Sequence, residues 1–145
     1  MFVLIKKYKN ISKTERQILN QIFFWLIYGF VLARFIPLRW FSSMLGEFRK
    51  ENQMMLNIEQ KETIRLVKKN IRRLKKRLPW KVKCFEEAIA AKKVLEKWGV
   101  KSTLYLGVKK DEKEKMMAHA WLTAGEEKIA GEKGYKKFTV VGCYA

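Results

Sequence analysis

The most informative part of this chain is residues 79–108, which read PWKVKCFEEAIAAKKVLEKWGVKSTLYLGV. Apolar residues recur at helical spacing from Cys84 to Trp98, and Gly99 ends the predicted helix. Residues 102–108 favour a β-strand. A helix that begins at a cysteine and leads into a strand is therefore expected at the centre of the domain.

Three more strands are predicted after this stretch, over residues 116–123, 128–130 and 137–143. A charged loop, residues 109–115, precedes the first of them, and Gly125 follows it as a hairpin turn. Helical patterns fill the earlier half of the chain. The predicted fold class is α+β, with N-terminal helices followed by a helix packed on a small antiparallel sheet.

In the N-terminal half, Ser12-Lys13-Thr14-Glu15 forms a capping-box pattern that predicts a helix running to about Ala33. Pro37 then interrupts the helical pattern. A second helix, over residues 59–77, has one apolar stripe and several faces rich in Lys and Arg. We therefore expect a helical segment at 1–58 and a core at 59–145, most simply as one continuous domain.

Composition limits the compartment and the partners. The 145 residues include 32 Lys and Arg against 14 Asp and Glu, a net charge of +18, which favours an anionic partner. The two cysteines, at 84 and 143, form neither a disulfide framework nor a CxxC metal motif. We expect reduced thiols, a cytoplasmic location, and no metal or cofactor.

The charge-free run from Ile22 to Ala33 is about 12 residues long, short of the roughly 20 that a membrane-spanning helix needs. Its apolar residues occupy most of the helix circumference, as in a helix that is buried or lies in lipid. The expectation is a buried or membrane-surface helix. The second case would bring the chain into peripheral contact with the inner face of the membrane.

Cys84 and His119 are the residues best suited to chemistry. Cys84 stands where a helix should begin, and a helix N-terminus beside cations lowers a thiol pKa. His119, the only histidine, lies on the predicted strand 116–123, on the face of Met117 and Trp121. A thiol and an imidazole are the nucleophile and base of cysteine catalysis, although a small buried cysteine and a structural histidine remain the alternatives.

A third group should orient the imidazole. The only aspartate, Asp111, precedes His119, so the carboxylates beyond it are Glu126, Glu127 and Glu132. Glu132 follows the strand after the hairpin, where its side chain could return beside His119. Glu132 is therefore the candidate third member, and a solvated surface glutamate is the alternative.

Six short motifs occur in order along the chain: Arg77-Leu78-Pro79-Trp80, Cys84-Phe85, Ala88-Ile89-Ala90-Ala91, Trp98-Gly99-Val100, Leu106-Gly107-Val108-Lys109 and Ala118-His119-Ala120-Trp121. In this combination they resemble the lasso-peptide biosynthesis B proteins of the stand-alone leader peptidase type. The resemblance implies a transglutaminase-like fold, like that of the microcin-processing protein C-terminal domain. It covers most of the chain and is strongest over about 64–132.

The resemblance implies a cysteine protease that cuts the leader from a ribosomally made lasso precursor. In such an enzyme Cys84 would be the nucleophile and His119 the base. The family places an acidic residue, normally aspartate, about a dozen residues after the histidine, where this chain has Gly131-Glu132. Either Glu132 substitutes, or a backbone group orients a Cys–His dyad. A small leader-binding protein and an ATP-dependent macrolactam synthetase are the implied partners, both separate chains.

Two alternatives to the peptidase stay open. The same fold could be a non-catalytic binding module that works through its basic helix, or a basic membrane-associated protein. No helix-turn-helix, zinc-finger or RNA-recognition pattern accompanies that helix, so nucleic acid is not the expected partner.

Overall fold

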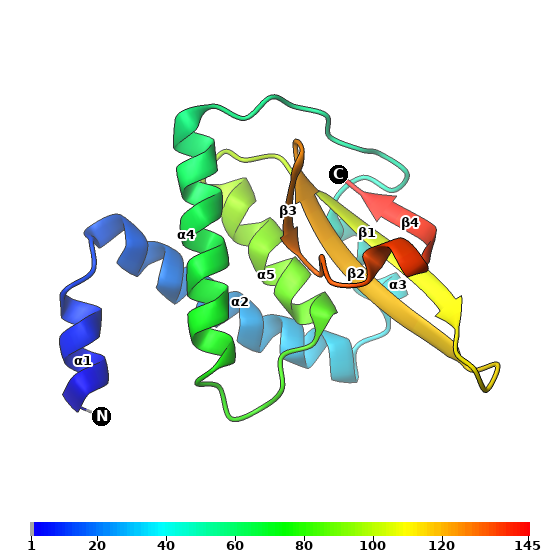
Figure 1. Cartoon of the computed structure of the whole chain (residues 1–145), viewed down its shortest axis with the longest axis horizontal. Helices are drawn as coiled ribbons and strands as arrows, with labels where there is room; N and C mark the ends of the chain where they lie inside the picture. The colour runs from blue at the N-terminus through cyan, green and yellow to red at the C-terminus, as the bar shows by residue number, and fades with distance from the viewer. Residues whose placement is uncertain (1) are drawn as a thin grey trace.

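A four-stranded antiparallel sheet lies beside a layer of helices (Figure 1). The computed structural model describes the backbone of residues 2–145 and the side chains of residues 6–145. The helices are α1 (Phe2–Lys9), α2 (Lys13–Phe35), α3 (Leu38–Phe41), α4 (Ile58–Lys75) and α5 (Cys84–Lys97), with short 3-10 turns η1 (Ser42–Leu45) and η2 (Tyr135–Lys137). The strands are β1 (Thr103–Lys110), β2 (Met116–Ala124), β3 (Glu127–Ala130) and β4 (Thr139–Tyr144).

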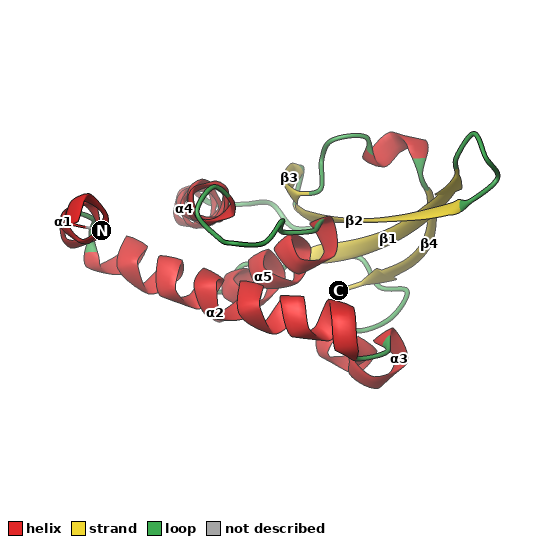
Figure 2. Ribbon diagram, turned by 90° about the horizontal axis from the view of Figure 1, so that it is seen from below, coloured by secondary structure: helices red, strands yellow, loops and turns green. Residues whose placement is uncertain are grey.

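The sheet has the order β3-β2-β1-β4, and α5 lies between it and α2 (Figure 2). The expected α+β class, with a helix packed on a small antiparallel sheet, is therefore confirmed. A single hydrophobic core includes Ile22 of α2, Val67 of α4, Ile89 of α5 and Leu122 of β2. Side chains from both halves of the chain thus share one core.

Local capping signals explain where the helices begin and end. The Ser12 side chain accepts a hydrogen bond from the backbone N–H of Glu15, which is one half of the predicted capping box. The Glu15 carboxylate instead contacts Lys69 and Asn70 of α4. Asn57 and Gln60 cap the start of α4 reciprocally. Gly99, after the end of α5, adopts a φ of 76°, which a residue with a side chain rarely takes.

The structure differs from the sequence-based expectation at several boundaries. Helix α1 was not predicted, and α2 continues to Phe35 instead of ending near Ala33. Helix α4 ends at Lys75, four residues before Pro79, because the chain turns there through hydrogen bonds from Arg77 and Leu78 to the Leu74 carbonyl. Pairing extends β1 to Lys110, which shortens the predicted charged loop to residues 111–115, and β2 begins at Met116 as predicted but continues to Ala124.

The predicted alternation along β2 is confirmed. Ala120 and Leu122 are buried in the core that the sheet shares with the helices. Trp121 instead stacks on Tyr105, its cross-strand neighbour on β1. Since successive side chains of a strand point to opposite faces, His119 shares the face of Trp121.

Candidate active site

Cys84 is the first residue of α5 and is half-buried against the core. Lys83 precedes it in an extended conformation, with φ −85° and ψ 158°. The first backbone N–H groups of a helix have no partner within that helix and carry the positive end of its dipole. The Cys84 thiol therefore lies at a helix start that favours negative charge.

A buried carboxylate two residues further along holds this helix start in place. Glu86 is fully buried and forms an ion pair with Arg34 of α2. It also accepts hydrogen bonds from the Trp80 indole, at 3.3 Å, and from the backbone N–H of Lys83, at 3.4 Å. Glu86 thus connects α2, the loop before α5 and the first turn of α5.

The role of Glu86 was not foreseen from the sequence. One local signal was present, because a glutamate at the third helical position commonly accepts a hydrogen bond from the N-cap backbone. The partner Arg34 is 52 residues away in the chain, so no local pattern indicates that pair. Gly29 allows α2 to lie close to the Glu86 backbone. A Cβ added at Gly29 would lie only 3.3 Å from the Glu86 Cα.

His119 is held by a backbone carbonyl. Its Nε2 lies 2.7 Å from the carbonyl oxygen of Gly131. A carbonyl can only accept, so Nε2 must carry the proton, and in the neutral ring Nδ1 is then the free acceptor. The ring stacks on Phe138, with ring centroids 4.9 Å apart, and on Trp121 at 6.0 Å. Together these contacts fix the tautomer and the ring orientation.

The chain geometry at Gly131 allows this hydrogen bond. Strand β3 pairs with β2 only at Leu122, Thr123 and Ala124, and Gly131 follows directly after it. Gly131 has a φ of +68°, and an added Cβ would lie 2.1 Å from the Ala120 carbonyl oxygen. Only glycine fits here, so the carbonyl that holds His119 depends on this residue type.

The other predicted site residue, Glu132, has an exposed side chain. Within the described part of the chain, no side-chain hydrogen bond joins it to His119, and the group bound to the ring is the neighbouring backbone carbonyl. Both alternatives stay predictions: Glu132 as the third member, and a Cys–His dyad oriented by the backbone. Cys143 lies on β4, where burial and then the charge of Glu51 raise the pKa of its thiol.

Helix α5 packs against β2, so Cys84 and His119 stand on neighbouring elements. No hydrogen bond joins their side chains among the contacts of the described residues. The Cys84 helix covers one face of the sheet, and the His119 ring lies on the other. Strand β3 pairs with β2 only from Leu122 to Ala124, which leaves the rest of that edge of β2, Met116 to Trp121, without a partner among the described strands.

Within residues 6–145, no group of three or more His, Cys, Asp or Glu side chains is placed to hold a metal ion.

A family model described as the transglutaminase-like superfamily matches residues 32–143 of the chain. The match includes α5 with Cys84, the whole sheet with His119, and Gly131. The chain belongs to the transglutaminase-like superfamily. Comparison with curated proteins and with solved structures gave no significant match.

Proposed function

We propose that this protein is a cysteine peptidase that removes the leader peptide from a lasso-peptide precursor. Membership of the transglutaminase-like superfamily, which includes cysteine proteases and transferases, supports the chemistry. The motifs around Cys84 and His119 that resemble lasso-peptide B proteins support the substrate. The observation that carries the proposal is the Gly131 carbonyl on His119 Nε2, because it leaves Nδ1 as the base.

In the proposed reaction His119 Nδ1 takes the proton of the Cys84 thiol. The thiolate attacks the scissile carbonyl, and backbone N–H groups at the start of α5 stabilise the oxyanion. The imidazolium then gives its proton to the leaving amine as the peptide bond breaks. Water, deprotonated by Nδ1, hydrolyses the thioester and releases the leader with a new carboxylate. The thiol and the ring would meet at the unpaired edge of β2.

The leader would reach this site with help from other chains. We propose that a small leader-binding protein delivers the precursor and that an ATP-dependent macrolactam synthetase closes the ring after the cut. The synthetase would use the ATP, so the peptidase itself would need no cofactor. We place the reaction in the cytoplasm, where a catalytic thiol stays reduced.

Cleavage of the precursor tests this proposal directly. Wild type and Cys84→Ala are incubated with precursor and leader-binding protein, and the products are measured by mass spectrometry. We expect no cleavage by Cys84→Ala, and full cleavage by the matched control Cys143→Ala. Equal cleavage by wild type and Cys84→Ala would refute a cysteine peptidase. His119→Ala should lower the rate by about 10²–10⁴-fold.

The pairing of thiol and imidazole can be measured without substrate. In a Cys143→Ala background, Cys84 is the only thiol, and its alkylation by iodoacetamide reports the thiolate fraction. We expect His119→Ala to slow alkylation at neutral pH if the ring takes the proton. An identical rate with and without His119 would show that the two side chains do not interact.

A non-catalytic binding module of the same fold is the second candidate. It is favoured by the basic side chains of α4 and the segment after it, which line one shallow hollow: Lys69, Arg72, Arg73, Lys76 and Arg77. Two of these, Lys69 and Arg73, already pair with Glu15. Three results together would favour this candidate. Wild type would not cleave the precursor, Cys84→Ala would still bind it, and removal of the basic charges on α4 would abolish binding.

A further inference from the structure

Helix α2 is apolar on two opposite faces. One face is buried against α4 and α5 and includes Ile18, Ile22, Leu26, Gly29 and Leu32. Within the described residues, α2 is also a helix long and apolar enough to cross a membrane by length and composition. A spanning position would pull its buried face out of the core. The helix therefore belongs to the folded domain, and its other face needs a separate explanation.

That other face is exposed to solvent and continues into α3. Its large side chains recur at spacings of three and four, and several are highly exposed, with Phe35 at 73% and Trp40 at 72%. We call this the α2–α3 apolar face, and it consists of Phe23, Phe24, Ile27, Tyr28, Val31, Phe35, Leu38 and Trp40. Contiguous exposed apolar side chains of this size indicate a binding surface.

The shape of this face suits a flat partner. Figure 2 shows α2 along the outer side of the helical layer, away from the sheet, with α3 following at its end. A single outer helix presents a convex ridge instead of a groove that would enclose a peptide or a second helix. A ridge with Trp40 and Tyr28 exposed matches an interfacial helix, since tryptophan and tyrosine favour the headgroup level of a bilayer.

Basic residues flank the face along its length. Lys97 of α5 is exposed and lines a hollow together with Phe24, Trp25 and Lys93, of which Lys93 is paired with Glu96. Arg39 is exposed within α3, between Leu38 and Trp40.

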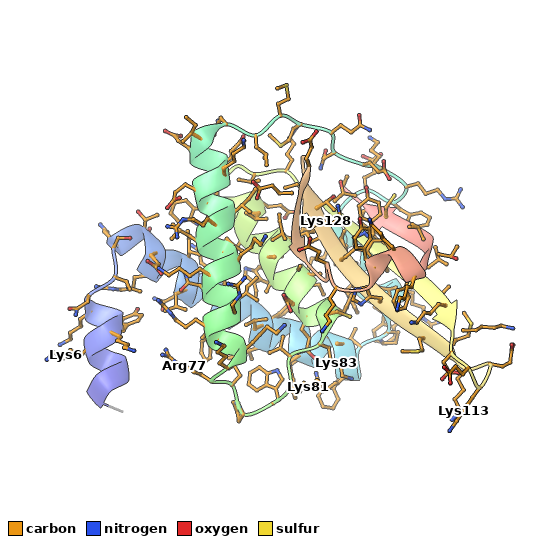
Figure 3. The ribbon with its side chains drawn as sticks, in the orientation of Figure 1. Lys6, Arg77, Lys81, Lys83, Lys113 and Lys128 are labelled. Atoms are coloured by element: carbon orange, nitrogen blue, oxygen red, sulfur yellow. The ribbon has the colours of Figure 1, made fainter. Side chains whose placement is uncertain are left out.

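The loop that carries Lys81 and Lys83 packs on α2 through Trp80, whose ring lies 5.0 Å from that of Phe30. Figure 3 labels both lysines on the segment that leads from α4 to α5, in the lower part of the view.

The carboxylates near this face are neutralised within the protein. Glu86 is buried and paired with Arg34. Glu96, which lines the same hollow as Phe24, pairs with Lys92 and Lys93. The surroundings of the apolar face are therefore positive, in agreement with the net charge of +18. An anionic lipid surface satisfies both features at once, because its acyl chains accept the aromatic side chains and its headgroups attract the cations.

We infer that the α2–α3 apolar face docks this protein on the surface of an anionic phospholipid bilayer. The exposed aromatic side chains enter the headgroup region, and the lysines on both flanks contact acidic headgroups. Helix α2 lies parallel to the bilayer plane and keeps its opposite face in the protein core. The start of α5 stays beside α2 through Arg34 and Glu86, so the proposed reaction would take place close to the membrane.

Vesicle co-sedimentation of the full chain tests this inference. The probes are vesicles of phosphatidylcholine alone and of phosphatidylcholine with phosphatidylserine. We expect binding only to the anionic vesicles and weaker binding at high salt. A triple variant, Phe24→Ser with Phe35→Ser and Trp40→Ser, should lose affinity on the order of 100-fold, because three exposed aromatic side chains that would enter the bilayer are removed.

A matched control removes three exposed apolar side chains elsewhere, with Met55→Ser, Met116→Ser and Val141→Ser, and should bind as wild type does. Circular dichroism of both triple variants checks that they are folded. Quenching of tryptophan fluorescence by brominated lipid measures insertion. The Trp40→Phe variant should show much less quenching than wild type.

Three results would overturn the inference. The first is no binding to anionic vesicles, and the second is equal affinity of wild type and the α2–α3 variant. The third is a wild-type dimer, seen by sedimentation, that anionic vesicles do not dissociate and that the α2–α3 variant no longer forms. That result would assign the face to a second copy of the chain. Cys84→Ala should bind vesicles normally, so a failure of the peptidase proposal leaves this test unaffected.

Discussion

The Nε2 atom of His119 lies 2.7 Å from the carbonyl oxygen of Gly131, and this backbone group orients the ring. In a Ser-His-Asp triad a carboxylate holds the histidine, whereas the acceptor on His119 is a neutral carbonyl of a glycine with a φ of +68°. A carbonyl stabilises an imidazolium less than a carboxylate does, because it carries only a partial charge. The orientation of His119 therefore depends on backbone geometry.

Replacing residues 131 and 132 separates the two possible orienting groups. We expect Glu132→Gln to change the cleavage rate by less than about threefold, because its side chain is exposed. Gly131→Ala should lose most activity, because the added Cβ would meet the Ala120 carbonyl and displace the Gly131 backbone. Steady-state cleavage rates measure both effects. A large loss in Glu132→Gln with an unchanged fold would instead establish Glu132 as the third member.

Gly107, the cross-strand neighbour of His119, leaves room for the aromatic side chains around the ring. An added Cβ would lie 2.7 Å from Trp121 and 2.9 Å from Phe138. Gly107→Ala should therefore shift both rings and weaken the stacking on His119. We expect a changed near-UV circular dichroism spectrum and shifted imidazole resonances of His119 by NMR. Gly134→Ala is the comparison, because its added Cβ meets no atom within 4 Å, although its φ of +79° adds local strain.

Glu86 should be important for stability as well as for the position of Cys84. Glu86→Gln removes the charge that pairs with Arg34 inside the protein, and we expect a loss of about 2–3 kcal/mol in the free energy of unfolding. Glu87→Gln is the control, since its partner Lys75 is largely exposed, and it should cost less than about 1 kcal/mol. Urea unfolding measures both variants. Equal losses would contradict a special role for Glu86.

Glu15 predicts a pH dependence of stability. Burial alone would raise the pKa of Glu15, but hydrogen bonds from Lys69 and Asn70 and the charge of Arg73 outweigh it and lower the pKa. A lowered pKa in the folded state stabilises the protein above the unfolded-state pKa, and this contribution is lost as pH falls through the folded pKa. Glu15→Gln should therefore destabilise at neutral pH by about 1 kcal/mol.

The difference between wild type and Glu15→Gln should shrink between neutral and acid pH, as pH falls through the lowered pKa of the wild-type carboxyl. Urea unfolding at the two pH values measures it. Glu62→Gln provides the comparison, because the Glu62–Arg65 pair is exposed on α4. A pH-independent difference for Glu15→Gln would show that its contacts do not depend on its charge.

Much of the fold could be predicted from local sequence. The hydroxyl of Ser12 caps α2, Gly99 follows the end of α5, and alternation along 116–123 separates Ala120 from His119, as expected. Each of these features depends on neighbours within a few residues. Helix ends and strand faces are consequently readable from the chain, with boundary errors where pairing with another strand extended β1 and β2.

The site was only partly predictable for the same physical reason. The sequence by itself determined that Cys84 begins a helix and that His119 lies on a strand, because capping and alternation are local. Only the tertiary structure decided that Gly131 holds His119, that Arg34 neutralises Glu86, and which apolar face of α2 is buried. These outcomes depend on contacts between distant segments, whose hydrogen bonds and burial arise only when the helices pack against one another and on the sheet.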